Sequence, residues 1–508
     1  MKRILVIILI TALFFSIFVL IKNFFAATLA TTDAEFVEEQ KEYQKDYSVP
    51  ERHVYHIKVN YEGKNQLRVQ MDLTYVNNTG STLEELYFHL YPNMFSSPER
   101  VPFFRQDFYR AFPQGYSFGA LDIIDVKQDG REVAWSLIQE DQILQLALDN
   151  PLHPEEISTI FMEFQLTVPQ ARFRFGYQEF GKDKITVSLG NWYPIPAVFK
   201  DGRWNLDRHQ AVGDCTYSDI ADYTVSFTVP KGFTVAASGV LEDNYTKGSM
   251  TVFEYSIDKI REFGAAISNN YQTASEKVDG IKIISYFHPE DKRGGFMALN
   301  VAKYALKIFN EAFGKYPYPE LRIAEANYYP GGMEFPTFIM MDSGRYKEAS
   351  LRNSSLERST AHEVAHQWWY NLVGNDQINE PWLDEGITEF ATAYYFEKRY
   401  GTPGRESYYS RQVDTTIDFI KNNPRHMLDP LPDFTSHGEY FAEVYVSGVL
   451  FYEDLRIRIG EDELLEFLRS YLETFKYKNV SLQEFIEFLK GKNYEALDES
   501  FYDKWFNH

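Results

Sequence analysis

Two histidines stand four residues apart in the stretch His362-Glu363-x-x-His366. Residues at this spacing lie one above the other on one face of an α-helix, so both imidazole rings can reach one metal ion. The pattern matches a zinc-binding signature of hydrolytic enzymes. Glu363 adjoins the first histidine and cannot easily bind the same ion. We therefore expect Glu363 to act as a general base, taking a proton from zinc-bound water and passing it to the leaving amine.

A third metal ligand is expected further along the chain, because a hydrolytic zinc site has three protein ligands and an open position for water. Glu385, within residues 381–386, is the candidate. Eighteen residues separate it from His366, which leaves room for a helix to end and for a second helix to begin at Pro381. We predict one zinc ion per chain, with His362, His366 and Glu385 as ligands.

The helix that carries the histidines needs a buried face and a cap. The residues that flank the ligand face at helical spacing are Leu356, Thr360, Val364 and Trp368. Asn353 or Ser354 can cap the start of the helix. Zinc-bound histidines usually donate their other N–H to a carboxylate or carbonyl, and Glu389 and Asp384 are candidates for this partner. Either carboxylate is equally expected on the solvated face of a helix.

A His-Glu-x-x-His string also occurs by chance on ordinary helices. Glu385-Gly386 on a second predicted helix favours the zinc interpretation over chance. A structural zinc site is disfavoured, because such sites are usually rich in cysteine and the chain has one cysteine, Cys215. No motif surrounds Cys215, and a lone cysteine is more often a small buried residue than a nucleophile.

The region before the zinc signature has the pattern of β-strands. Apolar residues alternate with polar ones at Leu67, Val69, Met71, Leu73 and Tyr75, and again at Tyr223, Val225, Phe227 and Val229. Turn residues end these runs at 77–80 and 230–232. We expect a large antiparallel β domain over residues 53–275.

The pattern becomes helical after about residue 290. Gly314 is expected to end this helix. Apolar residues recur before it at three- and four-residue spacing, at Phe296, Leu299, Ala302, Ala305, Ile308 and Phe309. Residues 321–327 and 333–341 look like strands, and most of residues 353–505 read as helices. We expect an α-rich domain over residues 276–508 that carries the chemistry.

The N-terminus predicts a membrane segment. Lys2 and Arg3 precede an apolar run over residues 4–21, whose length of eighteen residues is close to what spans a bilayer. We interpret residues 1–30 as an uncleaved membrane anchor or, alternatively, as a signal peptide that is removed after Ala30. Residues 31–52 are expected to form a polar spacer. Either interpretation places the catalytic part outside the cytoplasm: as a single-pass protein of the cell membrane, or as a secreted one.

Composition excludes one class of partner. The chain has 508 residues, enough for two or three domains, and a formal net charge of −22. Since no block of lysine and arginine is present, we expect no nucleic-acid binding.

Four ordered motifs resemble the zinc aminopeptidases of the aminopeptidase N (membrane alanyl aminopeptidase) family, which are of the gluzincin type. The motifs are Tyr316-Pro317-Tyr318-Pro319, Gly331-Gly332-Met333-Glu334, His362-Glu363-x-x-His366-Gln367-Trp368 with Trp382-Leu383-x-Glu385-Gly386, and Tyr445-x-x-Gly448. The resemblance is specific from about residue 316 to residue 450, and it extends over roughly residues 50–505 in architecture.

The resemblance implies a saddle-like β domain packed on a thermolysin-like catalytic domain. It implies that Tyr445 donates a hydrogen bond to the oxyanion of the tetrahedral intermediate. It also implies that Glu334 holds the free α-ammonium of a peptide substrate, while Gly331, Gly332 and Met333 let the two backbones approach. The expected function is removal of N-terminal residues from peptides with a free N-terminus.

Three departures from the family pattern stand out. Phe335 occupies the place of the family's usual asparagine. A second amine-binding residue is not evident, although residues 190–194 lie where it could come from. About sixty residues follow Tyr445, so we expect a short form without the family's C-terminal helical domain.

Two other functions remain open from the sequence. One is a zinc endopeptidase or another zinc hydrolase on the same scaffold, with Glu334 diverted from amine binding. The other is a catalytically idle peptide-binding protein, which is disfavoured because the ligand residues, Glu363 and Tyr445 are all present.

Overall fold

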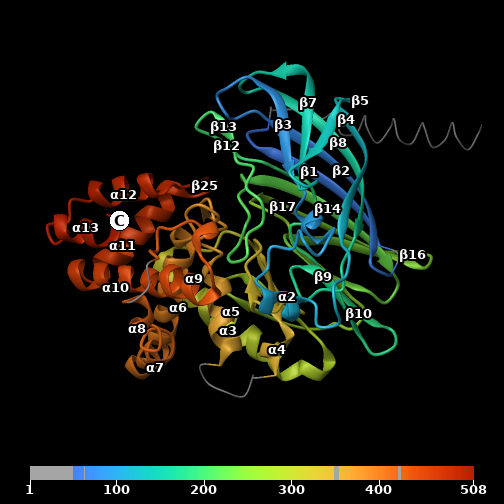
Figure 1. Ribbon diagram of the computed structural model, residues 1–508. Helices are drawn as coiled ribbons and strands as arrows, with labels where there is room; N and C mark the ends of the chain where they lie inside the picture. Colours follow the sequence, from blue (N-terminus) through green and yellow to red (C-terminus); the bar gives the residue numbers. More distant parts are fainter. Residues whose placement is uncertain (1–49, 62, 348–353, 422–424, 508) are drawn as a thin grey trace, which may run out of the picture. The chain divides into compact units, whose positions relative to one another are not determined.

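Strands account for most of the described residues before residue 290, and helices for most of those after it (Figure 1). The structure is a computed structural model, and it describes residues 50–61, 63–347, 354–421 and 425–507. The predicted membrane segment at residues 4–21 lies outside these residues. Within the described ranges, no helix has both the length and the apolar character needed to cross a membrane.

An eight-stranded sheet is the largest element of the β-rich part. Its strands, in spatial order, are β16 (Val240–Lys247), β17 (Met250–Ile260), β14 (Ala221–Pro230), β1 (His53–Tyr61), β2 (Gln66–Val76), β8 (Ile157–Thr167), β4 (Ala120–Gln128) and β5 (Arg131–Glu132). The predicted alternation is confirmed, because Leu67, Val69, Met71, Leu73 and Tyr75 of β2 are all buried. One pair differs from the expected antiparallel sheet: β1 and β14 run parallel. These two strands are far apart in the chain, so no tight hairpin forces them to run in opposite directions.

Smaller sheets complete the β-rich part. One contains β15 (Thr234–Ala237), β18 (Ala265–Ser268), β10 (Lys184–Leu189) and β9 (Phe175–Phe180). Another contains β11 (Ile195–Pro196), β3 (Leu83–His89), β7 (Ile143–Leu152) and β6 (Trp135–Ile138). A two-stranded sheet joins β12 (Phe199–Lys200) to β13 (Arg203–Trp204). The helical segments here are η1 (Tyr91–Phe95) and α2 (Arg105–Ala111).

A five-stranded mixed sheet begins the second part of the chain. Its spatial order is β19 (Gln272–Val278), β20 (Ile281–Phe287), β21 (Glu320–Ala326), β23 (Phe338–Asp342) and β22 (Gly332–Met333). The strands expected within residues 321–327 and 333–341 are therefore present as β21, β22 and β23. The expected boundary between residues 275 and 276 falls inside β19, so the change of sheet comes a few residues earlier.

Helices cover this sheet and continue to the end of the described chain. They are η2 (Pro289–Asp291), α3 (Lys292–Phe313), α4 (Ser343–Tyr346), α5 (Ser355–Ala365), α6 (Trp382–Tyr400), α7 (Thr402–Gln412), α8 (Ile417–Ile420), η3 (Leu431–Asp433), α9 (His437–Tyr440), the π-helix η4 (Phe441–Ser447), α10 (Gly448–Ile459), α11 (Glu461–Phe475), α12 (Leu482–Gly491) and α13 (Glu499–Phe506). A short sheet pairs β24 (Val373–Gly374) with β25 (Lys478–Asn479). The predicted helix stop is confirmed, because α3 ends at Phe313 and Gly314 follows with a φ of 122°.

Buried polar contacts join the β-rich part to the helical part. Arg261, which follows β17, is 2% exposed, and its Nε donates to the carbonyl of Tyr370 at 2.6 Å. The same guanidinium donates to the carbonyl of Lys478 at 2.6 Å. A buried arginine needs hydrogen-bond acceptors for its N–H groups, so these contacts fix the position of the β-rich part against the helical part. The cleft of the candidate site is lined by residues of both parts, so its shape depends on this packing.

Candidate functional site

Helix α5 presents the two histidines and Glu363 on adjoining positions. Ser354 caps its first turn, since the Ser354 hydroxyl accepts a hydrogen bond from the backbone N–H of Glu357 at 3.2 Å. This is one of the two predicted caps. Leu356, Thr360, Val364 and Trp368, the residues predicted to flank the ligand face, are fully buried. The helix ends at Ala365, so His366 lies at its C-terminal cap with helical backbone angles.

Three donor atoms converge between α5 and α6. His362 Nε2 lies 3.1 Å from His366 Nε2 and 3.1 Å from Glu385 Oε2. His366 Nε2 lies 3.3 Å from the same carboxylate oxygen. In a tetrahedral zinc site with bonds of about 2.0–2.1 Å, ligand atoms are about 3.3–3.4 Å apart. Two imidazole nitrogens and one carboxylate oxygen at this spacing therefore fit zinc.

Each histidine is oriented by a contact through its other ring nitrogen. His362 Nδ1 lies 2.9 Å from Glu389 Oε2, and Tyr408 donates its hydroxyl to the other oxygen of Glu389. His366 Nδ1 lies 2.9 Å from the carbonyl oxygen of Trp369. Such partners select the ring tautomer that leaves Nε2 free to bind a metal. Of the two predicted partners, Glu389 contacts a histidine through a hydrogen bond, whereas Asp384 bonds to Asn375 and Gln377 instead.

Tyr445 reaches this cluster from the π-helix η4. Its hydroxyl donates to Glu385 Oε1 at 2.5 Å, and its ring stacks on His362 with centroids 5.7 Å apart. π-helical turns are rare and often occur at functional sites. Burial raises the pKa of Tyr445 well above its usual value, so the hydroxyl keeps its proton and remains a donor.

Two glycines let η4 come this close to α6. A Cβ added to Gly448 would lie 2.5 Å from the Cα of Gly386, and one added to Gly386 would lie 3.0 Å from the Cα of Gly448. Any side chain at either position would push the two backbones apart. Because Gly386 adjoins Glu385 and Gly448 follows Tyr445 by three residues, this contact holds the tyrosine hydroxyl at the carboxylate.

The short strand β22 lies against Glu363. In the sheet, β22 pairs only with β23 and so forms its edge. A Cβ added to Gly332 would lie 2.1 Å from Glu363 Oε1, so only glycine leaves room for that carboxylate. Burial raises the pKa of Glu363 to about 7, a value suited to a general base near neutral pH. Gly331 has a φ of 133°, and the predicted substrate-binding residue Met333 is fully buried.

Glu334 follows β22 and is 2% exposed. Its Oε1 accepts a hydrogen bond from Gln377 at 3.3 Å, and Gln377 also donates to Asp384 at 2.8 Å. No cation within the described ranges lies at ion-pair distance from Glu334. Burial raises its pKa well above the usual value, and the negative charge of Asp214 raises it further. Glu334 is therefore a buried acid that a bound cation would stabilise in its ionised form.

The β-rich part supplies the other wall of the site, which we had not predicted from the sequence. Asp214 pairs with the buried Arg174, whose guanidinium also donates to the Tyr328 hydroxyl at 3.1 Å. Asp214 lies in an irregular loop and belongs to no motif, so only its position in space marks it. Tyr440, five residues before Tyr445, was likewise missed; it is 5% exposed and lines the same cleft.

The structure places two of the departures from the family pattern. Asn191, in the stretch that could have supplied a second amine-binding residue, donates to Thr216 and Glu262 at 3.0 and 2.5 Å and does not line the cleft. Phe335 is fully buried, and its ring fills the space above two glycines: a Cβ added to Gly190 or Gly264 would lie 2.4–2.5 Å from ring atoms. Phe335 therefore packs the two parts together and does not shape the cleft.

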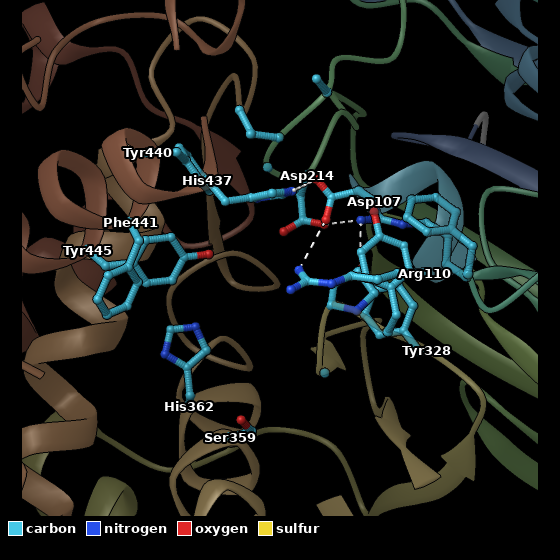
Figure 2. Close-up of a pocket in the computed structure, with 18 of the residues that line it drawn as sticks. Asp107, Arg110, Asp214, Tyr328, Ser359, His362, His437, Tyr440, Phe441 and Tyr445 are labelled. Carbon is cyan, nitrogen blue, oxygen red and sulfur yellow. Dashed lines mark hydrogen bonds and ion pairs between the residues drawn. The ribbon is translucent and has the colours of Figure 1, made fainter. Parts of the chain in front are cut away.

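A cleft of about 360 Å³ lies in front of the three donor atoms. Figure 2 shows His362 and Ser359 on α5, with Tyr440 and Tyr445 on one side of the cleft and Asp107 and Arg110 on the other. Gly332, Glu363 and Asp214 also line it, whereas Glu334 does not. The cleft thus has access to the donor atoms, a buried base and one acidic wall.

Comparison with known proteins agrees with this geometry. Residues 297–505 match the peptidase family M1 domain. The chain is 26% identical to human (Homo sapiens) endoplasmic reticulum aminopeptidase 2 over 266 residues, which are 49% of this chain and 26% of that protein. It is 28% identical to mouse (Mus musculus) aminopeptidase B over 195 residues, which are 35% of this chain and 29% of that protein. The chain thus spans about a quarter of the length of these relatives.

A solved structure extends the similarity to both parts of the fold. The M1 zinc metallopeptidase of Deinococcus radiodurans superposes with a TM-score of 0.63 at 18% identity, over 91% of this chain and 95% of that one. The β-rich part followed by an α-rich part is therefore the fold of M1 peptidases. The aminopeptidase N subfamily and the short form stay predictions. Residues 297–505 thus resemble a peptidase family M1 domain, and this region is similar in sequence to parts of known aminopeptidases.

Proposed function

We propose that this chain is a zinc aminopeptidase that removes N-terminal residues from peptides. The observation that carries the proposal is Glu334, which is buried and has no ion-pair partner among the described residues, and whose pKa the negative charge of Asp214 raises further. His366, Glu334 and Asp384 have polar atoms within 4.8 Å of one another, so Glu334 lies directly beside the donor atoms. An ammonium held there leaves only one residue between the amine and the reacting bond.

The edge of β22 supplies the track for the substrate backbone. An extended peptide can add to an exposed sheet edge through main-chain hydrogen bonds. Gly331 and Gly332 add no side chain of their own to that edge, and the side chains of Arg345 and Glu363 lie against them. With its ammonium at Glu334, the peptide runs along β22 towards Pro330. Its first peptide bond then lies in front of His362, Glu363 and Glu385.

The chain's own groups have distinct roles in the reaction. Zinc, when bound by His362, His366 and Glu385, supplies a Lewis acid that makes water a nucleophile near neutral pH. Glu363 accepts the proton of the attacking water and delivers it to the leaving amine. Tyr445 donates its hydroxyl hydrogen bond where negative charge develops on the carbonyl oxygen. Tyr440 lies beside it on the same side of the cleft.

The proposal is tested by blocking the amine. Wild-type protein is assayed on aminoacyl chromogenic substrates and on their N-acetylated counterparts, with zinc content measured on the same samples. We expect cleavage of the free substrates only, and loss of that preference in Glu334→Ala. Equal cleavage of both forms would show an endopeptidase or another hydrolase. Absence of any cleavage by zinc-loaded protein would show a peptide-binding protein.

We also propose that residues 4–21 anchor the protein in the cell membrane, with the catalytic part outside the cytoplasm. The support is the length of the apolar run and the basic residues that precede it. Retention of the full chain in the membrane fraction, compared with a chain that starts at Thr31, tests the anchor. Recovery of a shortened, soluble form from the full chain would show signal cleavage instead. The division into domains at residues 53–275 and 276–508 is kept as a proposal, and its boundary falls inside β19.

A further inference from the structure

The segment around β22 has opposite charges at its two ends. On the segment that contains β22, Glu334 lies at one end, and four residues earlier the carbonyl of Pro330 accepts a hydrogen bond from Arg345 at 3.2 Å. On α5, His366 lies beside Glu334, whereas Arg358 lies eight residues earlier, at the other end of the helix. Each of these two segments thus has an arginine at the end away from Glu334. At the Glu334 end, Arg174 is present but already pairs with Asp214.

Arg358 lies on the same face of α5 as the zinc-binding signature, one helical turn before His362, and its side chain lines the cleft. No carboxylate in the described part of the chain lies within 4.0 Å of its guanidinium, and no hydrogen bond to that group is found there. Two other arginines of the helices, by contrast, are paired: Arg399 with Glu357 and Arg456 with Glu397. An arginine left without a partner inside a cleft is available to bind an anion.

The reach of Arg358 indicates where that anion lies. Four residues of helix place its Cα about 6 Å from that of His362 along the axis. An extended peptide advances about 3.3–3.6 Å per residue. If the first peptide bond lies at His362 and the peptide continues towards Pro330, a carboxylate one or two residues beyond that bond comes opposite Arg358.

We propose that Arg358 binds the C-terminal carboxylate of dipeptides and tripeptides, so that the site prefers short peptides with both termini free. This inference rests on the proposed function, because Glu334 sets the direction of the peptide. Arg345 strengthens the same end of the cleft, held in place by Ser359 and by the Pro330 carbonyl. The cleft then matches a zwitterion: carboxylates face the ammonium, and guanidinium groups face the carboxylate.

The test compares a tripeptide that ends in a free acid with the same tripeptide amide. For wild-type protein we expect kcat/KM to be about 10- to 100-fold higher for the acid, since a charge-assisted hydrogen bond is lost in the amide. The difference should lie mainly in KM. In Arg358→Gln the acid-to-amide ratio should fall to near one, and Arg358→Lys should restore part of it. A hexapeptide should show little difference between its acid and amide in any variant.

Arg110 provides a matched control, because it is an arginine of the same cleft that already pairs with Asp107 at 3.2 Å. The acid-to-amide ratio of Arg110→Gln should equal that of wild type. A wild-type ratio near one, or an unchanged ratio in Arg358→Gln, overturns the inference.

An aminoacyl anilide, which has no C-terminal carboxylate, separates this inference from the proposed function. Suppose that the protein cleaves the free anilide but not its N-acetylated form, and cleaves the tripeptide acid and the tripeptide amide equally well. This result would contradict the role of Arg358 and leave the proposed function standing. Failure to cleave the anilide and both peptides removes the proposed function and this inference with it.

Discussion

The two walls of the cleft are built in different ways. The helical wall, with His362, His366 and Glu385, comes from α5 and α6, and its polar atoms contact one another at 3.1–3.3 Å. The β-rich wall, with Asp214 and Arg174, comes from an irregular loop and the segment that leads into β9. The difference suggests a division of labour. In the proposed function, the helical part holds the groups that change a bond together with Glu334, and the β-rich wall adds the negative charge of Asp214.

Removal of the metal or of the base should have the largest effect and should not depend on the substrate. We expect a chelator to abolish activity, because it removes the zinc ion that His362, His366 and Glu385 are proposed to bind. Added zinc should restore the activity. Glu363→Gln should lower kcat by about 10²–10⁴-fold while zinc content stays near one per chain. Both are measured on an aminoacyl anilide, with metal analysis of each sample. A Glu363→Gln protein that keeps more than a tenth of wild-type kcat would contradict the assignment of the base.

Tyr445→Phe should lower kcat by about 10²–10³-fold, because it removes one hydrogen-bond donor to the developing oxyanion. KM and zinc content should change little, since the ring still stacks on His362. Tyr440→Phe is the matched control from the same side of the cleft. If Tyr440→Phe loses more kcat than Tyr445→Phe, the two tyrosines have to exchange roles.

Gly448→Ala should weaken both stability and catalysis. Its methyl group would lie 2.5 Å from the Cα of Gly386, so η4 and α6 must separate. Overpacking of this kind costs about 1–3 kcal/mol of unfolding free energy, and the shift moves Tyr445 away from Glu385. Denaturant unfolding and kcat are measured together. Gly491→Ala, at a site where an added Cβ meets nothing within 4 Å, should change neither quantity.

Asp214→Asn should have the smallest effect on rate and the clearest effect on selection. Asparagine keeps an oxygen for Arg174 but loses the negative charge that attracts an ammonium. We expect the preference for free over N-acetylated substrates to fall about tenfold, with kcat for the free substrate within a few-fold of wild type. A fall in kcat as large as that of Tyr445→Phe would mean that the β-rich wall takes part in the chemistry and that the two walls are not separate in function.

Secondary structure was predictable where one periodic pattern dominated. The alternation in β2 and the apolar stripe of α3 both appear in the structure, because each pattern reflects burial of one face. The parallel pairing of β1 with β14 was not predictable. Strand direction between distant segments depends on how the whole sheet assembles, and a single strand carries no record of it.

The functional site divides in the same way. Spacing on a helix is a local quantity, so His362, Glu363 and His366 determined their own arrangement, and the residues around Glu385 needed only a helix that returns to meet them. Arg358 is also marked by local spacing, because it lies one helical turn before His362, although we did not predict it. Asp214 and Tyr440 have no spacing that distinguishes them from other residues of their type. They matter only because packing of distant segments brings them to one cleft.

The sequence by itself thus determined that one face of a helix carries two histidines and a base, and that the chain divides into β-rich and α-rich parts. The tertiary structure decided that Gly386 and Gly448 bring Tyr445 to Glu385 and that Asp214 joins Glu334 at one end of the cleft. It also decided that Phe335 fills the interface between the two parts. The physical reason is the range of each effect: helical periodicity acts over a few residues, whereas packing and charge act between residues that lie from about sixty to more than a hundred positions apart in the chain.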